Sequence, residues 1–331
     1  MLGRTLASVF AGAVALGAMG VAAHAQQKGG SSAAYPDRPI RMIDPFPPGG
    51  GTWVIGRIVE DKLAEILGQP IVHDNRGGAG GAIGTELAAR APSDGYTLAL
   101  ATASTIAVNP VLSKVPYDPV KDFAPVGQLG SIPLLLVVHP SLPAKNVNEL
   151  IALAKSRKGG LNYASAGTGT LSHLAGELFK VTARVDITHV PYKGGGPALN
   201  EIIGNQVQLF FANVLSGLPF AKSGRLRAIA VTGAKRTQAA PEIPTVAESG
   251  LPQFTVSNWY GVLAPARTPP EIVMKLNQAI NRALEMSDVR ERLGNLGADP
   301  GGGTREAFGA HIRSELAKWG KVVKQADIRP E

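Results

Sequence analysis

The sequence predicts an α/β fold built from two similar lobes. Short apolar runs alternate with helical patterns almost to the C-terminus, and this alternation is typical of parallel sheets covered by helices. Most of the predicted strands are followed by a loop rich in Gly, Thr or Ser. The chain has 331 residues, a length that suits about two domains. We therefore expect each lobe to be a doubly wound mixed sheet flanked by helices.

The first block contains three predicted strands, each followed by a polar or Gly-rich loop. The strands are expected at 40–44, 71–73 and 96–101, and helices are expected from about 53 to 67 and up to about 90. Gly68 ends the first helical pattern, because glycine readily adopts the left-handed conformation at a helix C-terminus. Glu60 and Asp61 fall between apolar positions of that helix, and we interpret them as part of a solvated face.

The second block repeats the same strand–loop–helix unit. It opens with the apolar run 134–138 and a helix ending near Lys158, whose start is predicted by the capping-box pair Asn146 and Glu149. Further strands are expected at 162–165, 187–190, 207–211 and 226–231.

The chain then returns to the first lobe. An apolar run at 259–264 precedes a long amphipathic helix (272–284) and two further helices. We expect lobe 1 to comprise residues 35–135 and 257–331 and lobe 2 to comprise residues 136–256. The two crossings between the lobes would form a hinge.

The N-terminus predicts export. Residues 1–25 combine Arg4, an apolar stretch from 6 to 21 and an Ala-x-Ala motif ending at Ala25, which are the three parts of a signal peptide. Residues 26–34 would form a flexible leader, with the fold starting near Tyr35. A membrane anchor is the alternative, but the stretch consists mostly of Ala and Gly.

Composition excludes several classes of chemistry. The chain has no cysteine, which removes thiol nucleophiles, thiolate metal sites, iron–sulfur clusters and disulfides. Its histidines form neither H-x-H nor H-E-x-x-H, and the G-x-S-x-G motif is absent. We expect no catalytic residues, no metal and no cofactor. The net charge of +8 permits an anionic partner, but the basic residues lack the interleaved aromatics of a nucleic-acid surface.

The glycine-rich loops predict anion binding. Residues 49–52, 166–170 and 194–196 stand where strands lead into helices, so their amide groups and the helix dipoles favour a negative charge. Neighbouring hydroxyls could add donors. The alternative is that the glycines only permit tight turns. None of the loops matches a nucleotide-binding fingerprint.

Six runs together resemble the Bug family of periplasmic solute-binding receptors, which are TctC-like components of tripartite tricarboxylate transporters. The runs are PFPPGGGT (45–52), LGQPIVHDNRGGAGGAIG (67–84), DGYTLALAT (94–102), NYASAGTGTLSHLAGELF (162–179), VPYKGGGPAL (190–199) and SNWYGVLAPARTP (257–269). The resemblance implies a two-lobed periplasmic binding protein (type II-like) that closes like a Venus flytrap on a small organic carboxylate. An integral membrane permease is the implied partner, and we expect a monomer.

The resemblance also implies which residues contact the ligand. In the first lobe they are Phe46, Gly49, Gly50, Thr52, Ser104 and Thr105. In the second lobe they are Ser165, Ala166, Gly167, Thr168, Thr170, His173, Tyr192 and Asn213. His173 lies one helical turn after Gly169 and Thr170, so a helix-capping or packing role is an equal alternative for it.

Three positions depart from the family pattern. Trp53 and Ala212 stand where many relatives have Asp, and Gly77 stands where Pro is usual. Losing two acids removes partners for an α-ammonium group, so we expect a carboxylate without an amine, aromatic acids included. Trp53 would then offer the ligand an apolar wall, or it packs on its own lobe. The alternative functions are a sensory partner of a membrane receptor and a periplasmic enzyme acting on carboxylates.

Overall fold

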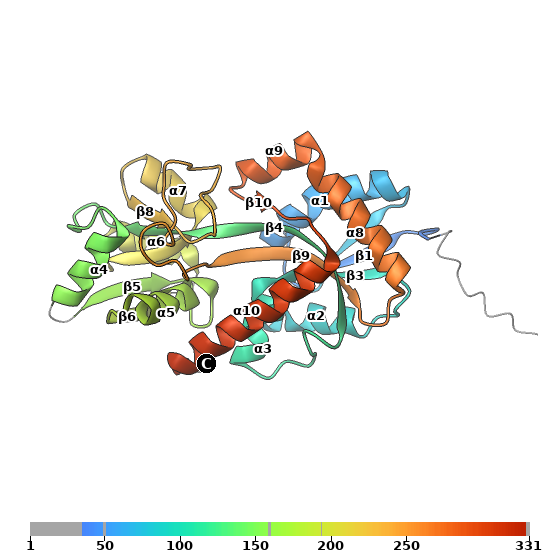
Figure 1. The fold of residues 1–331 in the computed structure, drawn as a ribbon, viewed down its shortest axis with the longest axis horizontal. Helices are drawn as coiled ribbons and strands as arrows, with labels where there is room; N and C mark the ends of the chain where they lie inside the picture. The colour runs from blue at the N-terminus through green and yellow to red at the C-terminus, as the bar shows by residue number, and fades with distance from the viewer. Residues whose placement is uncertain (1–34, 49–50, 158–159, 193, 329–331) are drawn as a thin grey trace, which may run out of the picture.

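The computed structural model describes residues 35–48, 51–157, 160–192 and 194–328. The expected signal peptide (1–25) and leader (26–34) lie outside the described residues. Two α/β lobes lie side by side along the long axis of the molecule (Figure 1), and the strands β4 (Phe123–Val138) and β9 (Ser257–Pro265) run between them. The α/β class and the two-lobed architecture predicted from the sequence are confirmed.

The first lobe surrounds the sheet order β2-β1-β3-β9-β4, with β10 also paired to β4. Its strands and helices before the crossing are β1 (Ile40–Asp44), α1 (Gly51–Leu67), β2 (Ile71–Asn75), η2 (Ala79–Gly81), α2 (Ala82–Ala89), β3 (Thr97–Thr102), η3 (Ser104–Val108) and α3 (Asn109–Leu112). Those after the return are α8 (Pro270–Glu285), α9 (Ser287–Asn295), β10 (Asp299–Pro300) and α10 (Arg305–Gln325). Strands β1, β2 and β3 are parallel, and β9 is antiparallel to both β3 and β4.

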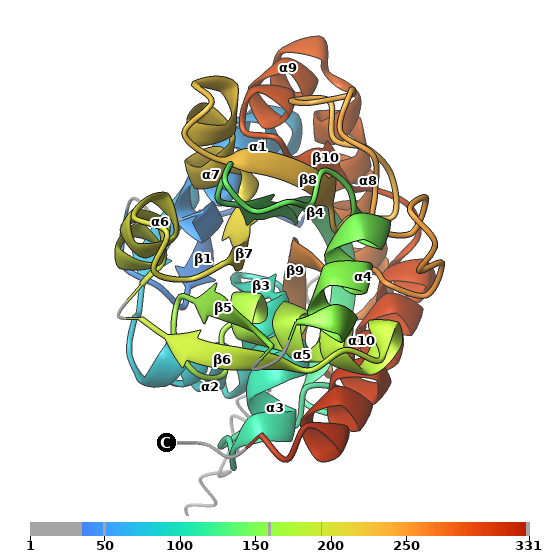
Figure 2. The ribbon, with the colours of Figure 1, turned by 90° about the vertical axis from the view of Figure 1, so that its left-hand side faces the viewer.

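The second lobe repeats this order as β6-β5-β7-β4, with β8 also paired to β4. Its elements are α4 (Val147–Ser156), β5 (Leu161–Ser165), α5 (Leu171–Ala183), β6 (Ile187–Pro191), α6 (Gly195–Ile203), β7 (Leu209–Asn213), α7 (Val214–Lys222) and β8 (Arg227–Val231). The capping box predicted for α4 is present, since the Asn146 side chain accepts from the Glu149 amide and Glu149 accepts from the Lys145 amide. Helices α4 and α5 lie on one side of this sheet and α6 and α7 on the other (Figure 2).

Two hydrophobic cores lie on the two faces of the continuous sheet. Successive strand residues alternate between the cores, as they must in a pleated strand: Leu134 and Leu136 belong to one core, and Leu135 and Val137 belong to the other. Helices α2, α4, α5 and α10 contribute to the first core, and α1, α6, α7, α8 and α9 contribute to the second. Both cores therefore continue through the crossing.

Strand β4 is longer than predicted. The expected strand at 134–138 is only the end of a 16-residue strand. Up to Pro133 it pairs with β9, and from Leu134 onward it pairs with β7 and β8. Register shifts near Pro125 and Gly130 accommodate the prolines and glycines that hid this strand in the sequence.

A buried hydroxyl ties the chain together where it crosses. Thr232, which is fully buried, accepts a hydrogen bond from the Leu134 amide (2.8 Å) and donates to the Val256 carbonyl (2.6 Å). It thereby links β4 to the segment entering β9. The division at residues 135/136 and 256/257 is consistent with this position but stays a prediction.

Two local expectations were wrong. Glu60 does not belong to a solvated face: it is 2% exposed and its carboxylate contacts His73 Nδ1 at 2.8 Å. Its neighbour Asp61 is exposed, as expected. The Thr/Ser-rich loop expected after the strand 96–101, at residues 102–105, is cut short, because a π-helical turn starts at Ser104 and continues into α3. No helix in the described part of the chain is long and apolar enough to cross a membrane.

Candidate functional site

The topology places loops from both lobes at one crevice. In each lobe the chain order of the three parallel strands is second, first, third, so the connections run in opposite directions along the sheet on either side of the first strand. Ligands of open α/β sheets bind beyond the carboxyl ends of the strands at such a point. Phe46 follows β1, Ser104 follows β3, and Thr168 follows β5. The same residues meet across one cavity.

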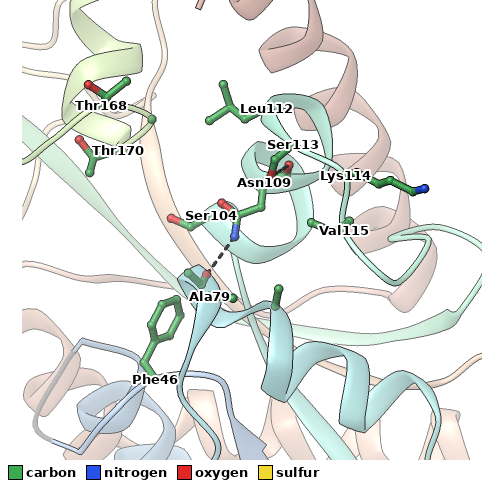
Figure 3. Close-up of a pocket in the computed structure, with 13 residues that line it drawn as sticks. Phe46, Ala79, Ser104, Asn109, Leu112, Ser113, Lys114, Val115, Thr168 and Thr170 are labelled. Atoms are coloured by element: carbon green, nitrogen blue, oxygen red, sulfur yellow. Dashed lines mark hydrogen bonds between the residues drawn. The ribbon is translucent and has the colours of Figure 1, made fainter. Parts of the chain in front are cut away.

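This interlobe cavity has a volume of about 570 Å³. Figure 3 shows Thr168 and Thr170 of the second lobe facing Ser104, Leu112 and Phe46 of the first. The lining residues are Phe46, Ala79, Gly80, Ala82, Ser104, Asn109, Leu112, Ser113, Lys114, Val115, Thr168, Gly169 and Thr170. Pockets of this size suit small molecules.

Hydrogen bonds fix the first-lobe wall. The Asp44 carboxylate accepts from the Phe46 amide (3.0 Å), and Asn75 Nδ2 donates to the Phe46 carbonyl (2.8 Å). Asn109 Nδ2 donates to the Gly80 carbonyl at 2.9 Å, which joins α3 to the turn before α2 (Figure 3). The wall is thus held by contacts between segments distant in the sequence.

The second-lobe wall is braced from within. Thr170 Oγ1 donates to the Gly167 carbonyl (2.6 Å), and the Gly169 amide donates to His173 Nδ1 (3.0 Å). The amides of Ala166 and Gly167 donate to the Ser172 and Ser165 hydroxyls, respectively. The Thr170 amide also donates to the Gly167 carbonyl (3.2 Å), so four amides of the 166–170 loop that were expected to face an anion already have acceptors. The side chain of Thr168 and the positive end of the α5 dipole remain at the cavity.

A stack of buried rings supports this loop. His173 is 5% exposed and stacks on His189, with ring centroids 3.9 Å apart. His189 Nε2 contacts Ser165 Oγ at 2.6 Å. The Tyr163 ring stacks on His189, and its hydroxyl donates to a Glu177 carboxylate oxygen at 2.6 Å. Burial raises the pKa of Tyr163, and the neighbouring carboxylate raises it further. His173 thus has the capping and packing contacts that the sequence left as one alternative.

The electrostatics of the cavity favour a negative guest. Of the described lining residues, Lys114 alone carries a formal charge, and no acid lines the cavity. Lys114 is exposed, and Figure 3 shows its side chain directed away from Ser104 and Phe46. Within the described residues, no group of His, Asp and Glu side chains could hold a metal ion.

Several other predicted contacts are not among the described residues that line the cavity. Gly49 and Gly50 lie outside the described residues. Thr52 is buried in the first turn of α1, and Thr105 is buried and bonded to Thr102. The Tyr192 amide donates a hydrogen bond to the Ser165 carbonyl (3.1 Å), which places the loop after β6 beside the loop after β5.

Two predicted contacts have local partners. Asn213 caps α7 by accepting from the Leu215 amide. Trp53 does not line the cavity: its ring lies edge-on to His73, with centroids 6.4 Å apart. This is the packing on its own lobe that was one of its two alternatives.

Sequence reasoning missed two parts of the wall. The lining residues that were not among the predicted contacts come from two segments: Asn109, Leu112, Ser113, Lys114 and Val115 in the first, and Ala79, Gly80 and Ala82 in the second. The glycine-rich run after β2 was a usable signal for the second segment, whereas nothing in the sequence of the first indicates a binding role. Tyr260 on β9 does not line the cavity, but its hydroxyl lies 2.7 Å from where a Cβ at Gly51, the first residue of α1, would stand.

Two α/β lobes, joined by crossing strands and enclosing a cavity at the ends of their parallel strands, define a two-lobed solute-binding protein. The family model described as "Tripartite tricarboxylate transporter family receptor" matches residues 55–328. The chain belongs to this family of periplasmic solute-binding receptors, and the resemblance to the Bug family is confirmed.

Several known proteins are similar to this chain. Protein BugT of Bordetella pertussis is 40% identical over 301 residues, which cover 90% of this chain and 92% of BugT. The structure titled "R. palustris Rpa4515 with adipate" is 38% identical, with a TM-score of 0.74, and the match covers 90% of this chain and 100% of that one. MatC (Rpa3494) from Rhodopseudomonas palustris with bound malate is 35% identical, with a TM-score of 0.70 and coverage of 87% and 100%.

Proposed function

We propose that this protein captures a small organic carboxylate between its lobes and delivers it to a membrane permease of the tripartite tricarboxylate type. The observation that carries the proposal is the interlobe cavity, whose only charged described lining residue is a lysine. The proposed contacts are the predicted residues in its wall, Phe46, Ser104, Thr168 and Thr170, together with the other loop residues predicted from the sequence, Gly49, Gly50, Thr52, Ser165, Ala166, Gly167 and Tyr192.

The ligand is a carboxylate without an amine. An α-ammonium group needs an acceptor, and buried charges without partners are costly. No acid lines the described cavity, and Ala212 is a buried apolar residue on β7. The similar proteins solved with adipate and malate hold acids of this kind. A linear dicarboxylate could reach both lobes at once.

Capture works by differential affinity. A ligand that touches both lobes binds the closed form more tightly than the open form, so it shifts the population toward closure. A hydrogen bond to a charged group contributes about 1.5–3 kcal/mol. A few such bonds therefore support tight binding without a buried arginine.

The alternatives differ in the step after binding. Membership in a receptor family disfavours an enzyme acting on carboxylates. A sensory partner of a membrane receptor would use the same cavity, so only the partner distinguishes it from a transport receptor. Copurification with permease subunits of the tripartite type supports transport, whereas copurification with a sensor kinase refutes the delivery step.

Calorimetric titration tests the ligand class. We expect malate, succinate, adipate, citrate or an aromatic acid to bind and to reduce the radius of gyration in small-angle scattering. Replacing Thr168 by Val should weaken binding by about tenfold or more, the loss of one hydrogen bond to a charged group. The matched control Thr188→Val, on the exposed edge of β6, should bind normally. Binding of aspartate or glutamate alone would contradict the proposal.

A further inference from the structure

A second cavity lies beside the crossing strands. It has a volume of about 460 Å³ and shares no lining residue with the interlobe cavity. Helix α10, β10, both crossing strands and the segment joining β8 to β9 form its wall. The lining residues are Gln128, Ser131, Ala234, Lys235, Arg236, Gln238, Thr255, Ser257, Trp259, Asp299, Pro300, His311, Glu315 and Lys318.

Trp259 presents an unpaired donor there. Its side chain is 1% exposed, and its Nε1 has no hydrogen-bond partner among the described residues. Indole Nε1–H can only donate, and a buried donor without an acceptor is a substantial free-energy cost. His311, whose ring lies edge-on to Trp259 at 5.6 Å, also has an unpaired buried Nε2. Trp259 Nε1 therefore lacks an acceptor among the described residues, which water or a ligand can supply, whereas His311 Nε2 donates or accepts according to its tautomer.

The charged groups around the cavity leave one cation unpaired. Lys318 donates to Glu315 and to the Thr255 carbonyl, and Glu315 also accepts from the neighbouring Trp319. Arg236 pairs with Glu248, outside the wall. Lys235 and Asp299, which both line the cavity, form no ion pair within the described part of the chain; burial raises the pKa of the Asp299 carboxyl, and the charge of Lys235 lowers it.

Uncharged hydrogen-bonding groups complete the lining. The hydroxyls of Ser131 and Ser257 also line the cavity and make no hydrogen bond to a described residue. Ser131 on β4 is the cross-strand partner of Trp259 on β9, and Ser257 lies two residues before Trp259 on the same strand. Beside the Asp299 carboxyl, the cavity thus offers an indole N–H, the ammonium group of Lys235 and two hydroxyls, which are donors suited to oxygen acceptors that carry negative charge.

We propose that this hinge cavity is a second ligand site, which binds a small organic acid whose carboxylate accepts from Trp259 Nε1 and is balanced by Lys235. The site does not depend on the proposed function, because its wall is separate from the interlobe cavity.

Indole ¹⁵N–¹H spectra test the proposal on the mature full chain. Trp53, Trp259 and Trp319 give three indole signals, and the signal that is lost in Trp259→Phe is assigned to Trp259. Succinate, adipate, citrate and benzoate are titrated in turn, with inorganic phosphate as a comparison. We expect at least one organic acid to shift the Trp259 signal to saturation. Lys235→Gln should weaken this binding by about tenfold or more, and the exposed Lys222→Gln should leave it unchanged.

The variant Thr168→Val separates this site from the interlobe cavity. If the Trp259 shift only reports lobe closure, it weakens with Thr168→Val and survives Lys235→Gln, which overturns the proposal. Absence of a shift with every acid, an equal shift in Lys235→Gln, or a shift with phosphate alone also overturns it. A shift lost in Lys235→Gln but kept in Thr168→Val supports it, even if no acid binds between the lobes.

Discussion

The buried group formed by Asp44, His73 and Glu60 makes the stability of the first lobe depend on pH. His73 contacts Glu60 through Nδ1 (2.8 Å) and Asp44 through Nε2 (3.2 Å). The Glu60 side chain is 2% exposed and that of Asp44 is fully buried. Burial raises the pKa of Glu60 from 4.5 to about 7 and also raises the pKa of Asp44.

The sign of the pH dependence is set by the raised pKa. The folded chain holds the Glu60 proton more tightly than the unfolded chain does, so this stabilisation is fully present below about pH 4.5 and is lost as the pH rises through about 7. At 1.36 kcal/mol per pKa unit, the difference corresponds to roughly 3 kcal/mol. Between pH 5 and 8 the same two pKa values predict a loss of roughly 2.5 kcal/mol.

Urea unfolding between pH 5 and 8 measures this effect. The wild-type free energy of unfolding should fall across the range, and Glu60→Gln, which cannot ionise, should lose most of that slope. Glu65→Gln is the matched control, because Glu65 lies on the same helix but is 61% exposed. A Glu60→Gln variant with the wild-type slope, or a wild type more stable at pH 8 than at pH 5, would refute the reasoning.

Three further predictions concern packing, steering and the hinge. A Cβ at Gly176 would stand 2.1 Å from a buried tyrosine ring, whereas one at Gly320 would make only an ordinary contact at 3.9 Å. Urea unfolding should therefore show Gly176→Ala destabilised by about 1–3 kcal/mol and Gly320→Ala stabilised by about 0.5–1 kcal/mol; equal effects would contradict this. Lys114→Gln should slow ligand association by roughly two- to fivefold at low salt in stopped-flow measurements, and Lys121→Gln, which lies outside the cavity wall, should not. Thr232→Val should lower the free energy of unfolding by about 1–3 kcal/mol, because the Leu134 amide loses its partner; an unchanged midpoint would show that the hydroxyl is dispensable.

Local patterns predicted most elements because the local and tertiary preferences agree. Strand β1 has the predicted bounds, and α1 ends at Leu67, before the predicted stop at Gly68. Strand β4 was truncated because its first part contains prolines and glycines that argue against a strand. Only pairing with β9, more than a hundred residues later, forms it. Glu60 was misplaced for the same reason: its partners lie on other elements.

Some residues of the candidate site could likewise be predicted from the sequence, and others depend on tertiary packing. The family resemblance indicated Phe46, Ser104 and Thr168, and each of these residues follows a strand at a predictable edge of a sheet. It did not indicate Asn109 or Lys114, whose place in the wall depends on how η3 and α3 pack against the turn at Gly80. The sequence also could not reveal that amides of the Ser165–Thr170 loop already donate to side chains of the loop and of α5, since these bonds depend on the conformation of the folded loop.

Strand β9 links the second cavity to the start of α1. Its alternate side chains face opposite sides of the sheet: Trp259 packs against Phe308 of α10 and lines the hinge cavity, whereas Tyr260 lies beside Gly51 at the start of α1. The start of α1 is one of the helix ends proposed to hold the carboxylate, and β9 also belongs to the hinge. An acid bound at Trp259 would therefore contact a strand that runs between the two lobes. Because binding free energies are linked reciprocally, any change that one acid makes in the affinity for the other must be equal in both directions.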